Sequence, residues 1–145
     1  METTLSSQEN HRYLREKAGY FFLKDLCLIS AEGSDLFSYL QTQTTNDVNE
    51  LKPGQGQNNA IVDRKARVIS TFSLHRTGEE SAVILVETQQ KENLLDHLNS
   101  FLFREDVTLT LSNHFVLALQ GPKSQKIIKN FTRSDDSIPE KPNDI

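Results

Sequence analysis

The chain has 145 residues, a formal net charge of -4, and a composition of 36% hydrophobic and 25% charged residues. This suits a single globular domain of common size, and the mild acidic excess argues against direct nucleic-acid binding, which needs clustered Lys and Arg. The only cysteine, Cys27, excludes an internal disulfide and any metal knuckle built from cysteine pairs, so we expect the reducing cytoplasm.

The first 19 residues are polar and charged, where a signal peptide would need an apolar stretch. No apolar run elsewhere approaches the roughly 20 residues needed to cross a bilayer. The sequence therefore predicts a polar extension over 1–19, with room for one short helix, on a cytoplasmic protein without a membrane partner.

A strand followed by a helix is predicted next. Strand-favouring residues fill 20–23 and 26–30, and 26–30 is the predicted buried strand. Ser34 is predicted to cap the following helix, because a serine oxygen accepts hydrogen bonds from the free amides of a first turn. The helix ends near Gln43, and the turn-forming residues of 44–56 predict a loop that reverses the chain.

An antiparallel meander is then predicted, followed by an amphipathic helix that packs across the sheet. The meander strands cover 59–63, 67–74 and 82–86, and the helix covers 89–103. Two strands and a helix complete the order, over 107–111, 114–119 and from Pro122 to Phe131. We expect an α+β fold, mostly antiparallel sheet with two or three packed helices. Residues 132–145 have little to bury and are predicted to be a flexible tail or linker.

The strongest local feature is the turn Asp63-Arg64-Lys65-Ala66-Arg67, which places four charges in five residues between two apolar strands. In a plain hairpin such a cluster is a solvated turn, and composition by itself favours that interpretation. A functional interpretation depends on the surrounding segments.

Several short segments precede and follow this turn in a distinctive order. They are Gly33-Ser34-Asp35, the stretch from Tyr39 to Val48, the turn itself with Val68, Leu74-His75-Arg76, Phe103 to Val107, and Gly121-Pro122. This order resembles the amino-terminal part of the folate-binding YgfZ proteins and their relatives, the aminomethyltransferases of glycine cleavage and the mitochondrial iron–sulfur assembly factors. The resemblance implies a GcvT/YgfZ-like folate-binding domain over 20–131.

Two positions depart from the glycines that are common in this family, namely Thr42 and Ala66. The replacement at Ala66 costs more if the turn needs a positive φ, which glycine tolerates and alanine resists. We therefore expect this turn to keep φ negative or to be slightly strained.

The resemblance also bears on activity. Aminomethyltransferases of this superfamily carry an Asp-Asp pair on the strand after a Gly-Gly turn, and Ser70 and Thr71 occupy the matching place. A hydroxyl supplies neither the charge nor the proton affinity of a carboxylate, so we predict no catalytic residue and no aminomethyl transfer. The K-G-C-x-x-G-Q motif of YgfZ proteins is absent from the chain, and Cys27, inside an apolar run, is expected to be a small buried hydrophobe.

The folate implied by the resemblance needs an apolar wall, a few hydrogen-bonding groups and cations for its glutamate tail. Lys65 and Arg67, with Arg64 beside them, are predicted to bind the tail carboxylates. The polar edges of the ligand are assigned to Gln43, Asn46 and Asp63. Leu26 stands where bacterial relatives often carry an aromatic residue, which Phe21 or Phe22 is predicted to replace.

Other candidate sites are excluded by spacing. The four histidines lack the separation of metal ligands, and no metal site is predicted. Gly54-Gln55-Gly56 lacks the residues that complete a phosphate-binding loop, so it is a turn.

Three functions remain open. The first is a non-catalytic unit binding tetrahydrofolate or a folate derivative, which the resemblance implies supports iron–sulfur cluster assembly or repair and, through it, tRNA modification. Its implied partners are folate, iron–sulfur assembly proteins and carboxy-terminal domains of the same protein. The second is a folate-dependent aminomethyltransferase of the glycine cleavage type whose catalytic groups lie outside this chain. The third is an interaction module that has lost folate.

Overall fold

The computed structural model describes residues 7–131, which fall into two compact units. The larger unit comprises residues 24–116, and the smaller combines residues 7–23 with 117–131. The elements of the larger unit are β2 (Leu26–Glu32), α2 (Leu36–Gln43), β3 (Gly56–Val62), β4 (Val68–Arg76), β5 (Ser81–Glu87), α3 (Lys91–Ser100) and β6 (Thr108–Leu111). Those of the smaller unit are α1 (Ser7–Glu16), β1 (Gly19–Phe22), β7 (Leu117–Gln120) and α4 (Ser124–Ile128).

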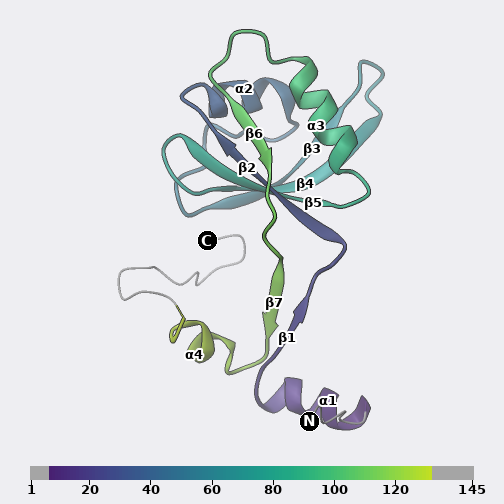
Figure 1. Ribbon diagram of the computed structural model, residues 1–145, viewed down its shortest axis with the longest axis vertical. Coiled ribbons are helices and arrows are strands. Elements are labelled where there is room, and N and C mark those ends of the chain that lie inside the picture. The colour runs from purple at the N-terminus through teal and green to yellow at the C-terminus, as the bar shows by residue number, and fades with distance from the viewer. Residues whose placement is uncertain (1–6, 132–145) are drawn as a thin grey trace. The chain divides into compact units, whose positions relative to one another are not determined.

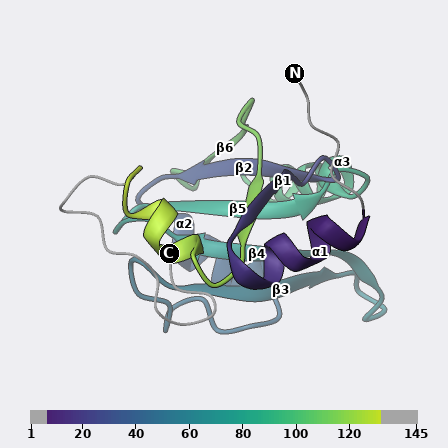
Figure 2. The same cartoon turned by 90° about the horizontal axis from the view of Figure 1, so that it is seen from below.

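The larger unit is built on a five-stranded antiparallel sheet with the order β3-β4-β5-β2-β6, which can be followed in Figure 2. The predicted meander is confirmed as β3-β4-β5. Ile84 at the centre of β5 lies opposite Leu74 of β4 and Ile29 of β2, so the apolar residues of three strands meet on one face. This alignment follows from the period of two in strand side chains.

Helices α2 and α3 pack on that same face (Figure 1). The fully buried side chains include residues of both helices and of the strands, namely Leu36, Leu40, Leu94, Leu98, Ile29, Ile61, Leu74 and Ile84. The hydroxyl of Tyr39 on α2 donates a hydrogen bond of 2.5 Å to the carbonyl oxygen of Leu98 on α3. The core therefore occupies one side of the sheet, and neither α2 nor α3 covers the other side.

The predicted strands and helices of the larger unit are confirmed, with boundaries that differ by a few residues. The strand predicted over 59–63 begins three residues earlier, at Gly56, because Gly56 pairs with His75 across the hairpin. The helix predicted over 89–103 is shorter, from Lys91 to Ser100. Both differences lie at the ends of elements, where residue propensities distinguish helix or strand from loop least well.

The predicted cap of α2 is wrong. Asp35 occupies the cap position, and no side chain there accepts a capping hydrogen bond. The hydroxyl of Ser34 instead donates to Asp106 Oδ2 at 2.9 Å, and the backbone amide of Asp106 donates to Asp35 Oδ2 at 2.9 Å. The hydrogen bond from Ser34, foremost through its side chain, lowers the pKa of Asp106. The hydroxyl of Ser34, predicted to cap the helix, is therefore hydrogen-bonded to Asp106, which lies 72 residues away in the sequence.

The smaller unit contains a two-stranded sheet in which β1 pairs antiparallel with β7. Gly121 follows β7 with a φ of 121°, and a Cβ there would lie 2.5 Å from the carbonyl oxygen of Lys17. That oxygen accepts a hydrogen bond from the backbone amide of Lys123, so the chain segment after α1 and the turn before α4 are held together. Tyr20 and Phe22 are 69% and 53% exposed, and their rings meet edge to face.

The short helix expected within 1–19 is confirmed as α1, and the last predicted helix is confirmed as the shorter α4. The strand predicted over 114–119 is observed as β7, which begins three residues later. The predicted tail over 132–145 lies outside the described residues. No helix within residues 7–131 is long and apolar enough to span a bilayer.

Candidate functional site

The charged turn is a tight hairpin between β3 and β4, organised by Asp63. Its Oδ1 accepts hydrogen bonds from the backbone amides of Lys65 at 2.8 Å and Arg67 at 3.0 Å, and its Oδ2 accepts one from Arg67 Nε at 2.7 Å. These bonds, with those of Arg67 foremost, lower the pKa of Asp63. The carboxylate predicted to bind folate therefore stabilises its own turn.

Ala66 adopts a φ of 59° in this hairpin. The expectation that the turn keeps φ negative is wrong, and the stated alternative of slight strain is confirmed. The amide of Ala66 donates to the carbonyl oxygen of Asp63 at 2.9 Å, so the hydrogen-bonded turn requires the left-handed conformation that alanine adopts at a cost.

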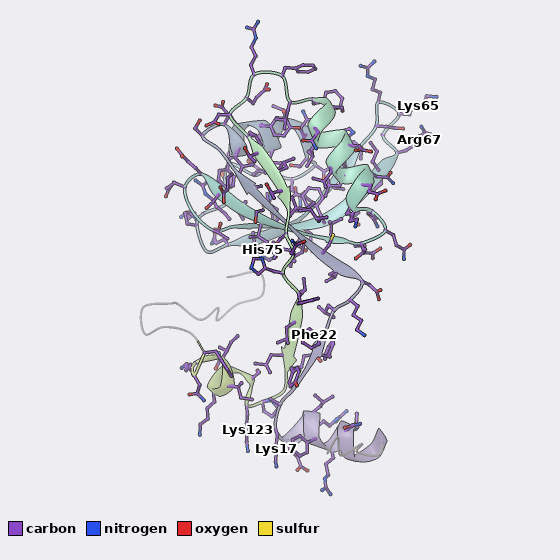
Figure 3. All side chains as sticks on the ribbon, in the orientation of Figure 1. Lys17, Phe22, Lys65, Arg67, His75 and Lys123 are labelled. Atoms are coloured by element: carbon purple, nitrogen blue, oxygen red, sulfur yellow. The ribbon has the colours of Figure 1, made fainter. Side chains whose placement is uncertain are left out.

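The two cations of the hairpin differ in their freedom to bind a ligand. Both project from the hairpin away from the sheet (Figure 3). Arg67 forms an ion pair with Asp63 at 2.6 Å, although its side chain is 75% exposed. Lys65 forms no ion pair with any residue of the part that the structure describes. Lys65 is therefore the cation of this pair that is available to an anion.

Gln43 and Asp63 line a pocket of about 640 Å³ on the helix side of the sheet. Its walls come from the end of α2, the β3–β4 hairpin and the last turn of α3, and they include Val62, His97 and Phe101. The side-chain amide of Gln43 donates to Thr42 Oγ1 at 3.0 Å.

Asn46 lines a different pocket of about 470 Å³, on the sheet face that α2 and α3 leave uncovered; we call this the open-face pocket. Its lining residues are Leu26, Thr45, Asn46, Asn58, Asn59, Ala60, Thr71, Phe72, Ser73, Leu85, Val86 and Glu87. The side-chain amide of Asn46 donates to the carbonyl oxygen of Asn58 at 2.5 Å, which fixes the loop after α2 against β3.

The structure thus separates the five residues predicted to bind folate. Asn46 lines the open-face pocket, Gln43 and Asp63 line the pocket on the helix side, and Lys65 and Arg67 line neither. Leu26 does line the open-face pocket, while Phe21 and Phe22 belong to the smaller unit.

Ser70 and Thr71 face opposite sides of the sheet, because consecutive strand residues alternate. Ser70 is buried, and its hydroxyl donates to Gln90 Oε1 at 3.0 Å. Thr71 lines the open-face pocket, and its backbone amide donates to the same Gln90 oxygen at 3.0 Å. Of these two hydroxyls, only that of Thr71 is placed to contact a ligand in this pocket.

Glu87 is a pocket residue that sequence reasoning missed. It is exposed at the end of β5, lies opposite Leu26 in the strand register, and lines the open-face pocket. The signal was present in the alternation of residues 81–87, which places Leu85 and Glu87 on one face and Ile84 and Val86 on the other.

Burial shifts the pKa of two further groups of the sheet, Cys27 and His75. Cys27 Sγ donates to the carbonyl oxygen of Val86 at 3.5 Å, and burial raises the pKa of this thiol, which keeps it protonated and unreactive at neutral pH. Burial lowers the pKa of His75 on β4, the histidine labelled in Figure 3. Within residues 7–131, no group of His, Cys, Asp and Glu side chains is arranged to hold a metal ion.

Comparison with known proteins gives a consistent result. The family model described as the GCVT N-terminal domain matches residues 2–142. The chain is 28% identical over 131 residues to the aminomethyltransferase of Bacillus cytotoxicus, covering 90% of this chain and 36% of that protein. It is 29% identical over 139 residues to the aminomethyltransferase of Thermus thermophilus, covering 94% of this chain and 40% of that protein.

Among solved structures, the glycine cleavage system aminomethyltransferase T from Bartonella henselae superposes with a TM-score of 0.75 at 22% identity. The match covers 84% of this chain and 34% of that one. The expected α+β fold with a mostly antiparallel sheet is therefore confirmed. The chain spans between a third and two fifths of the length of these relatives.

Proposed function

The chain belongs to the GCVT N-terminal domain family, and on that premise we propose that it is a folate-binding unit whose ligand ring occupies the open-face pocket. The observation that carries the proposal is the meeting of Asn46 and Thr71 in one pocket. Asn46 belongs to one of the segments that carry the family resemblance, and Thr71 lies on β4, the strand after the charged turn. Leu26, Ala60 and Leu85 supply the apolar wall that a flat ring requires.

We propose further that the unit is of the YgfZ type, non-catalytic and cytoplasmic, and serves iron–sulfur cluster assembly or repair and thereby tRNA modification. The support for a non-catalytic role is chemical. Thr71 presents a hydroxyl to the pocket, and a hydroxyl cannot hold the charge or accept the proton that a carboxylate handles.

The glutamate tail of the folate is assigned to the charged hairpin. Lys65 is the leading candidate because it has no ion-pair partner within the described residues, whereas Arg67 is paired with Asp63. Lys65→Ala should therefore weaken binding of tetrahydrofolate more than Arg67→Ala does. Titration calorimetry on the two variants compares them directly, and equal affinities in both variants and the parent would remove the hairpin from the site.

The experiment that tests the proposed function is a titration of the ¹⁵N-labelled chain with tetrahydrofolate, followed by NMR. We expect the amide signals of Asn46, Thr71 and Ser73 to shift in a saturable way, since these residues line the pocket. Thr108, at the far edge strand, does not line that pocket and is the internal control. Absence of saturable shifts at up to millimolar ligand would contradict the proposal and favour an interaction module that has lost folate.

A second candidate function is aminomethyl transfer, because the relatives named above are aminomethyltransferases. The chain spans a minor part of their length, so the catalytic groups would lie in other segments. Assaying this chain joined to the remaining segments of such a protein for methylenetetrahydrofolate formation distinguishes the two. Turnover that survives Thr71→Val would favour the transferase and show that Thr71 is dispensable.

Partner domains are also proposed, and two features support them. The relatives are more than twice as long as this chain. In the smaller unit, Tyr20, Phe22 and Leu117 are each about half exposed or more on a sheet of only two strands, a size that is marginal alone. We assign this apolar surface to contact with the carboxy-terminal domains of a longer protein.

A further inference from the structure

Glu87 is the only ionisable residue among those that line the open-face pocket. Glu87 is the last residue of β5, and its neighbour Val86 lies opposite Phe72 of β4. Thr71 directly precedes Phe72, so Glu87 and Thr71 lie on adjacent strands near the same point of the sheet. A carboxylate is therefore present in this pocket, but it comes from the strand beside the one on which the family pattern would place it.

A short hydrogen-bond network joins Glu87 to the strand that carries Thr71. Gln90 Nε2 donates to Glu87 Oε2 at 3.3 Å, while Gln90 Oε1 accepts from Ser70 Oγ and from the backbone amide of Thr71. Gln90 thereby orients one carboxylate oxygen of Glu87, and Glu87 Oε1 has no protein donor among the described residues.

Three other polar residues of the pocket, Ser73, Asn58 and Asn46, are already hydrogen-bonded to one another. Ser73 Oγ donates to Asn58 Oδ1 at 2.7 Å, and the side-chain amide of Asn46 donates to the carbonyl oxygen of Asn58. Glu87 is thus the strongest hydrogen-bond acceptor that the pocket offers to a ligand, since a carboxylate has about four lone-pair sites.

We infer that Glu87 is the specificity-determining residue of this pocket and that it binds the amino-pyrimidinone edge of a pterin. That edge carries a ring N–H and an exocyclic amino group side by side, two parallel donors that match the two oxygens of a carboxylate. The inference rests on the proposed function, because it names the group that recognises the ring in the same pocket.

The test compares two ligands and three proteins by NMR titration. The ligands are tetrahydrofolate and its 2-deamino-2-methyl analogue, which lacks the exocyclic donor. The proteins are the parent chain, Glu87→Gln and the control Glu92→Gln, which removes the same charge from an exposed site on α3 outside the pocket. Glu87→Gln should weaken tetrahydrofolate binding about tenfold or more, as expected for the loss of a charged hydrogen-bond pair, with Glu92→Gln within about twofold of the parent.

The analogue separates recognition from a purely structural role. It should bind the parent about tenfold more weakly than tetrahydrofolate, and Glu87→Gln should weaken its binding less than that of tetrahydrofolate, because only the ring N–H still pairs with the carboxylate. If the parent binds both ligands equally, or if Glu87→Gln binds tetrahydrofolate as the parent does, the assignment of Glu87 is wrong while the folate pocket stands. If the parent binds neither ligand, both the assignment and the proposed function are wrong. Equal binding of the two ligands by the parent overturns the assignment even if Glu87→Gln fails to fold.

Discussion

At the scale of single residues, Asp63 stabilises the charged hairpin and also pairs with Arg67, so the guanidinium of Arg67 is less available to a ligand. The carboxylate of Asp63 accepts hydrogen bonds from the backbone amides of Lys65 and Arg67 and from the guanidinium of Arg67. These contacts support the interpretation of the segment as a structural turn, and the functional interpretation remains a proposal for Lys65. Asp63 and Arg67 stabilise the turn, and Lys65 remains available to bind an anion.

The left-handed conformation of Ala66 predicts that Ala66→Gly stabilises the chain. Relief of the alanine's left-handed strain, offset in part by the greater flexibility of glycine when unfolded, should raise the free energy of unfolding by about 0.5–1 kcal/mol. Urea denaturation of the two proteins measures this difference. Destabilisation by glycine would mean that the turn has negative φ in solution.

Asp63 predicts a pH-dependent contribution to stability. Its pKa lies below the ordinary 3.8, so the unfolded state takes up a proton first as the pH falls. The contribution is present above pH 3.8 and disappears as the pH drops through the lower folded-state pKa. Thermal melts should show Asp63→Asn to be less stable than the parent at pH 6, with the gap closing in strong acid. A gap that is unchanged by acid would contradict the assigned hydrogen bonds.

At the scale of elements, two long-range contacts position α2. Ser34 and Asp35 at its start bond to Asp106, and Tyr39 within it bonds to the carbonyl oxygen of Leu98 on α3. The helix is thereby held at both its start and its buried face, which places its end and the loop with Asn46 against β3. The open-face pocket depends on this placement because Asn46 forms part of its wall.

The contact of Tyr39 predicts a stability change in alkali. Burial, with a smaller effect of Glu105, raises the pKa of Tyr39 to about 12, above the ordinary 10.0. Between these values the unfolded state loses its proton first, so the stability of the parent should fall as the pH rises from 10 to 12. Tyr39→Phe should cost about 1 kcal/mol at pH 7 for the lost hydrogen bond. Denaturation at pH 7 and pH 11 should show this cost shrinking; a constant cost would contradict the burial of the phenol.

At the scale of the whole molecule, the two units differ in how much core each has. The larger unit buries residues of four strands and two helices, whereas the smaller unit has a sheet of two four-residue strands with exposed aromatic side chains. Such a small sheet is marginal without further packing. The chain is expected to be unevenly stable.

Hydrogen exchange tests this expectation. Amides of β5 should be protected at least about 100-fold more than those of β1, because opening β1 exposes little apolar surface. Exchange of the intact chain read by NMR at residues 19–22 and 81–87 gives the comparison. Equal protection in both strands would show that the smaller unit is stable by itself and would remove one support for the proposed partner domains.

The sequence by itself determined the order of the elements in the larger unit, the antiparallel meander and the GcvT-like superfamily, because periodicity, turn residues and short motifs are local properties of the chain. It also singled out Asn46 as a candidate ligand-binding residue, and Ser70 and Thr71 as the hydroxyl residues that bear on activity. Only the tertiary structure decided which of these share a site. In the folded chain, Ser34 bonds to Asp106 and Arg67 pairs with Asp63. Ser70 and Thr71 lie on opposite faces of the sheet. Glu87 lines the open-face pocket. These outcomes depend on strand register and on contacts between residues far apart in the chain, which no local pattern contains.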